Sequence, residues 1–160
     1  MVPGYTGANA ELFQNVATKG LEYVLTHCYK EGLNFILDST FSKYEIAKRN
    51  IKLAIKKGRN IEIVYIYQEP LKTWEFVKKR EKAEGRNVPI DAFINSYFGA
   101  FDTLKMIKDE YRSEVSLRVV NKHTGEVHRD VDRVDSYVKI SYSDSTELKS
   151  AVEEWGKSKK

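Results

Sequence analysis

The chain has 160 residues, of which 41% are hydrophobic and 31% are charged, with nine glycines and three prolines. This composition excludes collagen-like and disordered proteins, and the length suits one domain over residues 1–160. No apolar run approaches the roughly 20 residues of a membrane-spanning helix, and the opening MVPGYTGANAELF lacks the layout of a signal peptide. The single cysteine, Cys28, excludes a disulfide framework and favours a reducing, cytoplasmic location.

The charge is mildly basic, with 27 Lys and Arg against 23 Asp and Glu and a net charge of +4. This permits a phosphate-bearing ligand but is too modest to indicate nucleic-acid binding. Seven basic residues and one acid lie between Lys43 and Arg59, which is typical of a solvated helix face. Between Lys72 and Arg86, six basic residues alternate with three glutamates, and this segment is the better place to look for function.

The spacing of the apolar residues and the positions of glycine and proline predict alternating helices and strands. In chain order we expect a helix over 10–30, a strand over 34–37, a helix over 43–57, a strand over 61–67, helices over 70–82 and 89–111, a strand over 115–120, a turn over 121–125 that begins a hairpin, weak alternation over 131–142, and a helix over 145–155. Gly32 supplies a left-handed stop, while Pro70 and Pro89 each open a helix.

The two strands over 34–37 and 61–67 are continuous apolar runs, which is typical of strands buried on both faces. Their alternation with helices predicts an α/β fold with three layers, in which helices flank a mostly parallel sheet. In such sheets, ligands bind beyond the carboxyl ends of the strands. The chemistry is therefore expected at Asp38-Ser39-Thr40 and at Gln68-Glu69.

Asp38 follows an apolar strand, a position that can hold Mg²⁺ through water or accept a proton from a substrate hydroxyl. The alternative is that Asp38, Ser39 and Thr40 cap the next helix, since all three residue types suit a cap. The pattern is common, and the residues alone leave both alternatives open.

Arg80 and Arg86 lie in the basic segment VKKREKAEGRNVP. Their planar, permanently charged groups suit a mobile lid that presents guanidinium groups to a polyphosphate. The alternative is an exposed ion pair between Arg80 and Glu84, which are four residues apart on a helix. The spacing favours neither alternative.

Other kinds of site receive less support. The sequence G-x-x-x-x-G-K-[ST], which cradles phosphates between a strand and a helix, does not occur among the 160 residues. The three histidines, at positions 27, 123 and 128, have no metal-site spacing, and no metal ligand is predicted. His123 and His128 flank the predicted turn, which favours a hairpin surface.

Taken in chain order, several of these sequence segments resemble the zeta toxin family of the P-loop kinase superfamily. The matching parts are the run over 34–40, the following helix with Gly58, the strand over 61–67, and the arginine-bearing segment up to Pro89. The resemblance covers residues 3–121, so that 122–160 form a hairpin and a C-terminal helix without a predicted role.

The resemblance implies an ATP-dependent phosphotransferase, a small-molecule kinase whose substrate is of the UDP-N-acetylglucosamine type. It implies Mg²⁺ and ATP as cofactors, a sugar nucleotide or other small molecule as substrate, and an antitoxin as partner. Asp38, Arg80 and Arg86 would be catalytic, with the arginines clamping the transferring phosphate. Ser39 and Thr40 would bind the substrate.

The chain also departs from the family pattern. Ser39 replaces a glycine, Ser42 falls where the toxin often has an arginine, and the first strand with its phosphate-binding loop has no counterpart. The resemblance therefore implies the fold without its first strand, and a chain that is inactive alone. We also expect exposed sheet edges to be covered by a homo-oligomer or a companion chain.

Two other functions remain open. One is a non-catalytic module that binds a nucleotide or a sugar nucleotide, as a sensor or an immunity element. The other is nucleic-acid binding through the helix between Lys43 and Arg59, which the moderate net charge disfavours.

Overall fold

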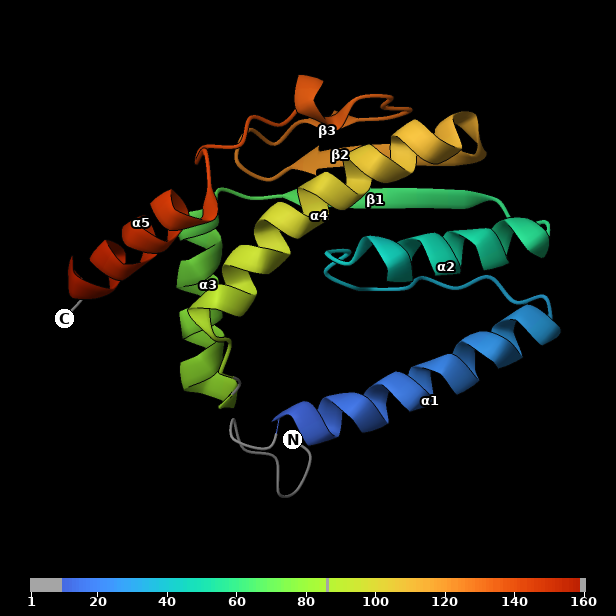
Figure 1. Ribbon diagram of the computed structural model, residues 1–160, viewed down its shortest axis with the longest axis horizontal. Helices are drawn as coiled ribbons and strands as arrows, with labels where there is room; N and C mark the ends of the chain where they lie inside the picture. Colours follow the sequence, from blue (N-terminus) through green and yellow to red (C-terminus); the bar gives the residue numbers. More distant parts are fainter. Residues whose placement is uncertain (1–9, 86, 159–160) are drawn as a thin grey trace. The chain divides into compact units, whose positions relative to one another are not determined.

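The computed structural model describes residues 10–85 and 87–158, with side chains from Val16 onward. In chain order, the described residues form α1 (Ala10–Lys30), α2 (Tyr44–Lys56), β1 (Ile61–Tyr67), α3 (Pro70–Glu84), α4 (Ile90–Tyr111), β2 (Val115–Asn121), β3 (Val127–His128) and α5 (Ser145–Ser158), with 3-10 turns at Arg112–Glu114 and Val134–Ser136 (Figure 1). No helix in these ranges is long and apolar enough to cross a membrane.

The chain divides into two compact units. The first consists of Met1–Ser39 and Val77–Val88, and the second of Thr40–Phe76 and Pro89–Lys160. The first unit thus holds α1 and the second half of α3. The second unit holds the sheet, α2, α4, α5 and the beginning of α3.

The five predicted helices are confirmed, with ends that differ from the prediction by a few residues. α1 ends as the sequence predicts, at a left-handed glycine. Gly32 has φ +68°, and the N–H of Leu33 reaches back to the carbonyl of Cys28 at 2.9 Å. A glycine adopts this backbone conformation without the steric cost that a side chain would add.

The predicted strand over 34–37 is wrong. These residues form no strand, and Ile36 is 98% exposed rather than buried. A strand needs a neighbour to satisfy its backbone, and no described strand pairs with this segment. One of its apolar side chains has a local partner: the Phe35 ring lies edge-on to Tyr29, with 5.3 Å between centroids.

The sheet has the order β1-β2-β3 and is mixed rather than all-parallel. β1 pairs with β2 in parallel, in a register that runs from Ile61 opposite Val115 to Tyr67 opposite Asn121. β2 pairs with β3 antiparallel, which confirms the predicted hairpin. Parallel neighbours need a long crossover, and α3 and α4 provide it.

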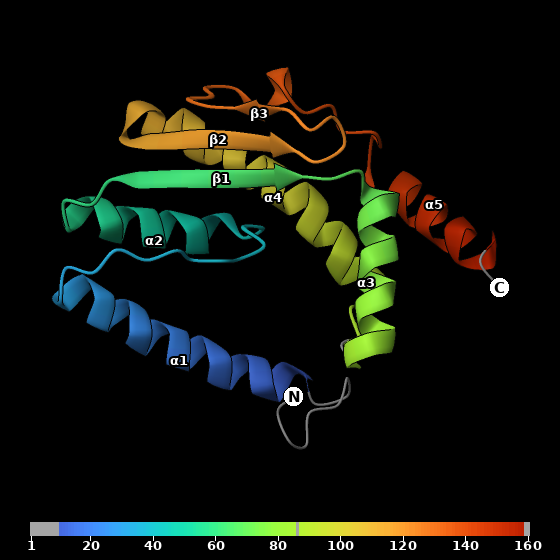
Figure 2. The same ribbon diagram turned by 180° about the vertical axis from the view of Figure 1, so that it is seen from behind.

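One face of the sheet carries the core of the second unit. α4 lies across this face, in front of the strands in Figure 1 and behind them in Figure 2. The segment after β3 forms a 3-10 turn rather than a strand, yet it closes the core. The buried cluster around this turn consists of Tyr67, Phe101, Leu104, Leu117, Val119, Val131, Val134 and Val138.

The close approach of α4 to the chain before α2 depends on Gly99. A Cβ atom at this position would lie 2.7 Å from the carbonyl oxygen of Ser42. Gly20 in α1 differs, because nothing lies within 4 Å of the corresponding position. Gly99 and Gly20 therefore serve as test and control.

We expect Gly99→Ala to lower the free energy of unfolding by about 1–3 kcal/mol, because the added methyl group overpacks against backbone. Gly20→Ala should instead stabilise α1 by roughly 0.5–1 kcal/mol through helix propensity. Urea denaturation followed by circular dichroism measures both. A neutral or stabilising Gly99→Ala would contradict the close approach.

Candidate functional site

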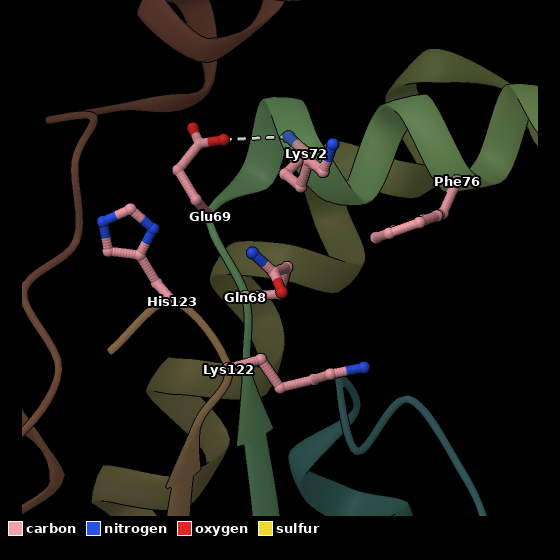
Figure 3. Close-up of a pocket in the computed structure, with 6 residues that line it drawn as sticks. All are labelled: Gln68, Glu69, Lys72, Phe76, Lys122 and His123. Atoms are coloured by element: carbon pink, nitrogen blue, oxygen red, sulfur yellow. Dashed lines mark hydrogen bonds between the residues drawn. The ribbon is translucent and has the colours of Figure 1, made fainter. Parts of the chain in front are cut away.

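The carboxyl ends of β1 and β2 form the best-defined candidate site among the described residues. Because Tyr67 lies opposite Asn121, the residues that follow each strand emerge level with one another. They line a cavity of about 390 Å³ within the second unit. Its lining residues are Gln68, Glu69, Lys72, Phe76, Lys122 and His123 (Figure 3). The expectation of a site at Gln68-Glu69 therefore coincides with a cavity at this position.

Glu69 organises the α3 side of the cavity. Its carboxylate accepts hydrogen bonds from the backbone N–H groups of Leu71, at 3.1 Å, and Lys72, at 2.8 Å. Pro70 follows Glu69 as the first helical residue, where its missing N–H costs nothing. Glu69 is thus the N-cap of α3, and its carboxylate is held by the helix that it starts.

The β2 side of the cavity is held by a turn. The buried Asn121 side chain accepts hydrogen bonds from the backbone N–H groups of His123, at 2.9 Å, and Thr124, at 3.2 Å. The N–H of Lys122 donates to the carbonyl of Tyr67 at 2.8 Å, which extends the pairing with β1 by one residue. Lys122 and His123 are therefore fixed at the backbone while their side chains remain free to meet a ligand.

The lining suits an anionic ligand with an aromatic or apolar part. Lys72 and Lys122 supply two positive charges against the one carboxylate of Glu69. Within the described ranges, the Lys122 ammonium group has no hydrogen bond or ion pair, whereas Lys72 pairs with Glu75 at 2.9 Å. In Figure 3, the Phe76 ring and the Lys122 side chain lie on the same side of Gln68, and His123 lies on the other.

The charge of Glu69 also acts on a neighbouring phenol. Burial, followed by the negative charge of Glu69, raises the pKa of Tyr142 above its usual range. Tyr142 therefore remains a neutral hydroxyl at physiological pH.

The residues predicted from the run over 34–40 lie outside this cavity. Asp38, Ser39 and Thr40 are all exposed, and the hydroxyl of Thr40 lies 2.9 Å from that of Ser42. The alternative that they cap the next helix is wrong: Lys43 is the N-cap of α2, and it makes no side-chain cap. The reason is that the chain turns at Phe41, which has φ +53° and lies between these three residues and the start of α2.

Of the two predicted lid arginines, Arg80 lies on α3 and Arg86 lies outside the described residues. Arg80 is exposed, and its guanidinium lies 3.7 Å from the carboxylate of Glu84. The exposed ion pair that the spacing allowed is therefore present. Across the described ranges, no hydrogen bond or ion pair joins Arg80 to Asp38.

Sequence reasoning missed Lys72, Phe76, Lys122 and His123. A signal for two of them existed, because Lys122 and His123 directly follow the predicted strand over 115–120. Lys72 and Phe76 lie in the segment from Lys72 to Arg86 that the sequence indicated for function, but its pattern did not predict that the first turns of α3 bring them to this cavity.

The N-cap role of Glu69 is open to a stability test. We expect Glu69→Ala to cost about 1 kcal/mol, because two N–H groups of α3 lose their acceptor. Glu69→Gln keeps an acceptor oxygen and should cost less. Thermal unfolding of both variants measures this, and equal losses would contradict the cap.

Comparison with known proteins identifies the family of the chain. The model of the zeta toxin family matches residues 1–134, which is most of the chain and extends beyond the 3–121 of the predicted resemblance. No curated protein and no solved structure gave a match. The match spans the sheet and both sides of the cavity, and it carries with it a kinase-like, nucleotide-binding function. The chain belongs to the zeta toxin family.

Proposed function

We propose that this chain is a zeta-toxin-like ATP-dependent phosphotransferase, or the substrate-side portion of one, acting on a hydroxyl of a sugar nucleotide of the UDP-N-acetylglucosamine type. The observation that carries the proposal is a cationic cavity at the carboxyl ends of two parallel strands, in a chain of this family. This is where α/β sheets bind their ligands. Residues 1–160 act as a single domain in this proposal.

In the proposed reaction, Lys72 and Lys122 hold phosphate oxygens, since ammonium groups form strong charge-assisted hydrogen bonds with them. The Phe76 ring offers a stacking surface for a nucleobase, and the Gln68 amide can both donate to and accept from its edge.

The family resemblance supplies the other roles. Asp38 accepts the proton of the attacked hydroxyl, and Ser39 and Thr40 contact the substrate. Arg80 and Arg86 neutralise the charge of the transferring phosphoryl group, which passes from ATP to that hydroxyl oxygen.

The described residues do not fit a resident Mg²⁺. They contain no group of three His, Cys, Asp or Glu side chains placed to hold a metal ion. The one carboxylate of the cavity, Glu69, already accepts two backbone hydrogen bonds. In the proposal, Mg²⁺ therefore enters with ATP.

A second function is favoured by the sequence, which contains no G-x-x-x-x-G-K-[ST]. That loop supplies most of the phosphate positioning in P-loop enzymes, so the 160 residues are expected to be inactive alone. A non-catalytic nucleotide or sugar-nucleotide module, as a sensor or an immunity element, uses the same cavity. Both functions place the chain in the cytoplasm, with an antitoxin and a homo-oligomer or companion chain as partners.

Binding of ATP is tested by calorimetric titration with Mg-ATP at low and physiological salt. We expect Lys122→Ala to weaken binding by about tenfold, because a charged hydrogen bond to phosphate is lost. Lys139→Ala is the matched control: it removes an exposed lysine that does not line the cavity. Equal affinities for the two variants, or no binding by the unaltered chain, would contradict the proposed site.

Catalysis is tested by transfer of labelled γ-phosphate to UDP-N-acetylglucosamine. We expect stabilisation by the ligands but no transfer by these 160 residues. Transfer that is lost in Arg80→Ala and kept in Lys82→Ala, a neighbouring lysine of α3, would show an active kinase and refute the expected inactivity.

A further inference from the structure

His123 lines the cavity at the carboxyl ends of β1 and β2, and the proposed reaction does not use it. The side chain is exposed, and no described residue forms a hydrogen bond or an ion pair with the imidazole ring. The ring therefore makes no polar contact that the fold requires. A polar side chain that lines a cavity without such a contact is available to a ligand.

The turn that carries His123 has a fixed backbone. The N–H of His123 donates to the side-chain oxygen of Asn121 at 2.9 Å. The carbonyl of Asn121 accepts the N–H of Gly125 at 2.8 Å, and the N–H of Asn121 donates to the carbonyl of Glu126 at 2.9 Å. Gly125 has φ +80°, a conformation that glycine adopts without steric cost. The turn thus holds the imidazole at the cavity and leaves only its side-chain torsions to adjust.

The two sides of the cavity differ in charge. In Figure 3, Lys122 lies on one side of Gln68, and His123 lies on the other, together with the carboxylate of Glu69. The ammonium group of Lys122 has no ion pair with a described residue, so its side of the cavity attracts an anion. While the imidazole is neutral, the charge on the other side is the negative charge of Glu69, which repels an anion.

A proton on His123 changes this balance. The two lysines of the lining, less its one glutamate, give a net charge of +1, and an imidazolium raises it to +2. The imidazolium also brings a charged N–H donor to the side of the cavity that lacks one. Charged donors form the stronger hydrogen bonds with phosphate oxygens.

The elements around His123 contain no second imidazole at the cavity. Histidine is the side chain that ordinarily gains or loses its charge between about pH 5 and 8. The other charged or titratable groups of these elements are carboxylates, ammonium groups and one phenol. They are Glu69 and Lys72 of α3, Lys122 and Glu126 of the turn, Tyr142 before α5, and Glu147 in the first turn of α5.

We propose that protonated His123 is a third cationic contact of this cavity, which binds one phosphate of a diphosphate ester while Lys122 binds the other. The inference rests on the proposed function, because it uses the same cavity and a ligand of the same class, a sugar nucleotide. Its consequence is that the cavity binds such a ligand more tightly as the pH falls.

The probe is UDP-N-acetylglucosamine. Each of its phosphates is substituted twice and lacks the ionisation near about pH 6 that a phosphate monoester shows. The charge of the probe is therefore constant, and a change of affinity with pH reports on the protein. Calorimetric titration at constant ionic strength measures the affinity. For the unaltered chain, we expect binding to tighten about fivefold from about pH 8 to about pH 5.5, which is the scale of one solvent-exposed ion pair.

Three variants assign the effect to one residue. His123→Gln removes the titrating ring and should bind at both pH values as the unaltered chain does at the higher one. His123→Arg has a permanent charge and should bind tightly at both. His128→Gln is the matched control, because His128 stacks on Tyr137 at 4.4 Å and does not line the cavity. It should keep the full dependence on pH.

The outcomes separate this inference from the proposed function. Loss of the pH dependence in His123→Gln alone would support the inference. The same pH dependence in His123→Gln as in the unaltered chain would overturn it and leave the proposed site in place, as would an affinity of the unaltered chain that does not change with pH. Loss of the dependence in His128→Gln as well would also overturn it. No binding at any pH would contradict the proposed function itself, and this inference with it.

Discussion

The parallel pairing of β1 with β2 is the constraint on which the rest of the second unit depends. It joins two segments separated by the whole of α3 and α4, so forming it carries the entropy cost of closing a long loop. The pairing brings Gln68 and Glu69 level with Lys122 and His123. A shift of one residue would turn the apolar face of β2 to the wrong side and take the cavity apart.

A buried lysine holds the entry to this pairing. Lys108 is 7% exposed, and its ammonium group donates to the carbonyls of Arg112 and Val115, each at 3.0 Å. Asp132 lies 3.6 Å away. A buried charge persists where it is paired in this way. The contacts tie the end of α4 to the first residue of β2 across the sharp turn at Arg112, where φ is +42°. The start of β2, and with it the register, is thereby fixed.

The second unit presents two surfaces of different chemistry. The carboxyl ends of the strands are polar and cationic, and they suit a phosphate-bearing ligand. The outer face of β1 combines the aliphatic side chains of Val64 and Ile66 with Glu62, which pairs with Arg118 of β2. One surface lies at the ends of the strands, and the other lies on the face of the sheet opposite α4.

Local pattern determined much of this fold. The helices, β1, β2 and the hairpin follow from apolar periodicity, from Pro70 at a helix start and from Gly32 at a helix end, all of which act within a few residues. Tertiary structure decided what depends on distant partners. The run over 34–37 is apolar enough for a strand but has no neighbour, and Lys72 and Phe76 join Lys122 only through the crossover. The sequence by itself determined the helices, the strands β1 and β2 and the family, because each of these depends on residues that lie close together in the chain. Which strands pair, and which side chains share a cavity, were decided by packing.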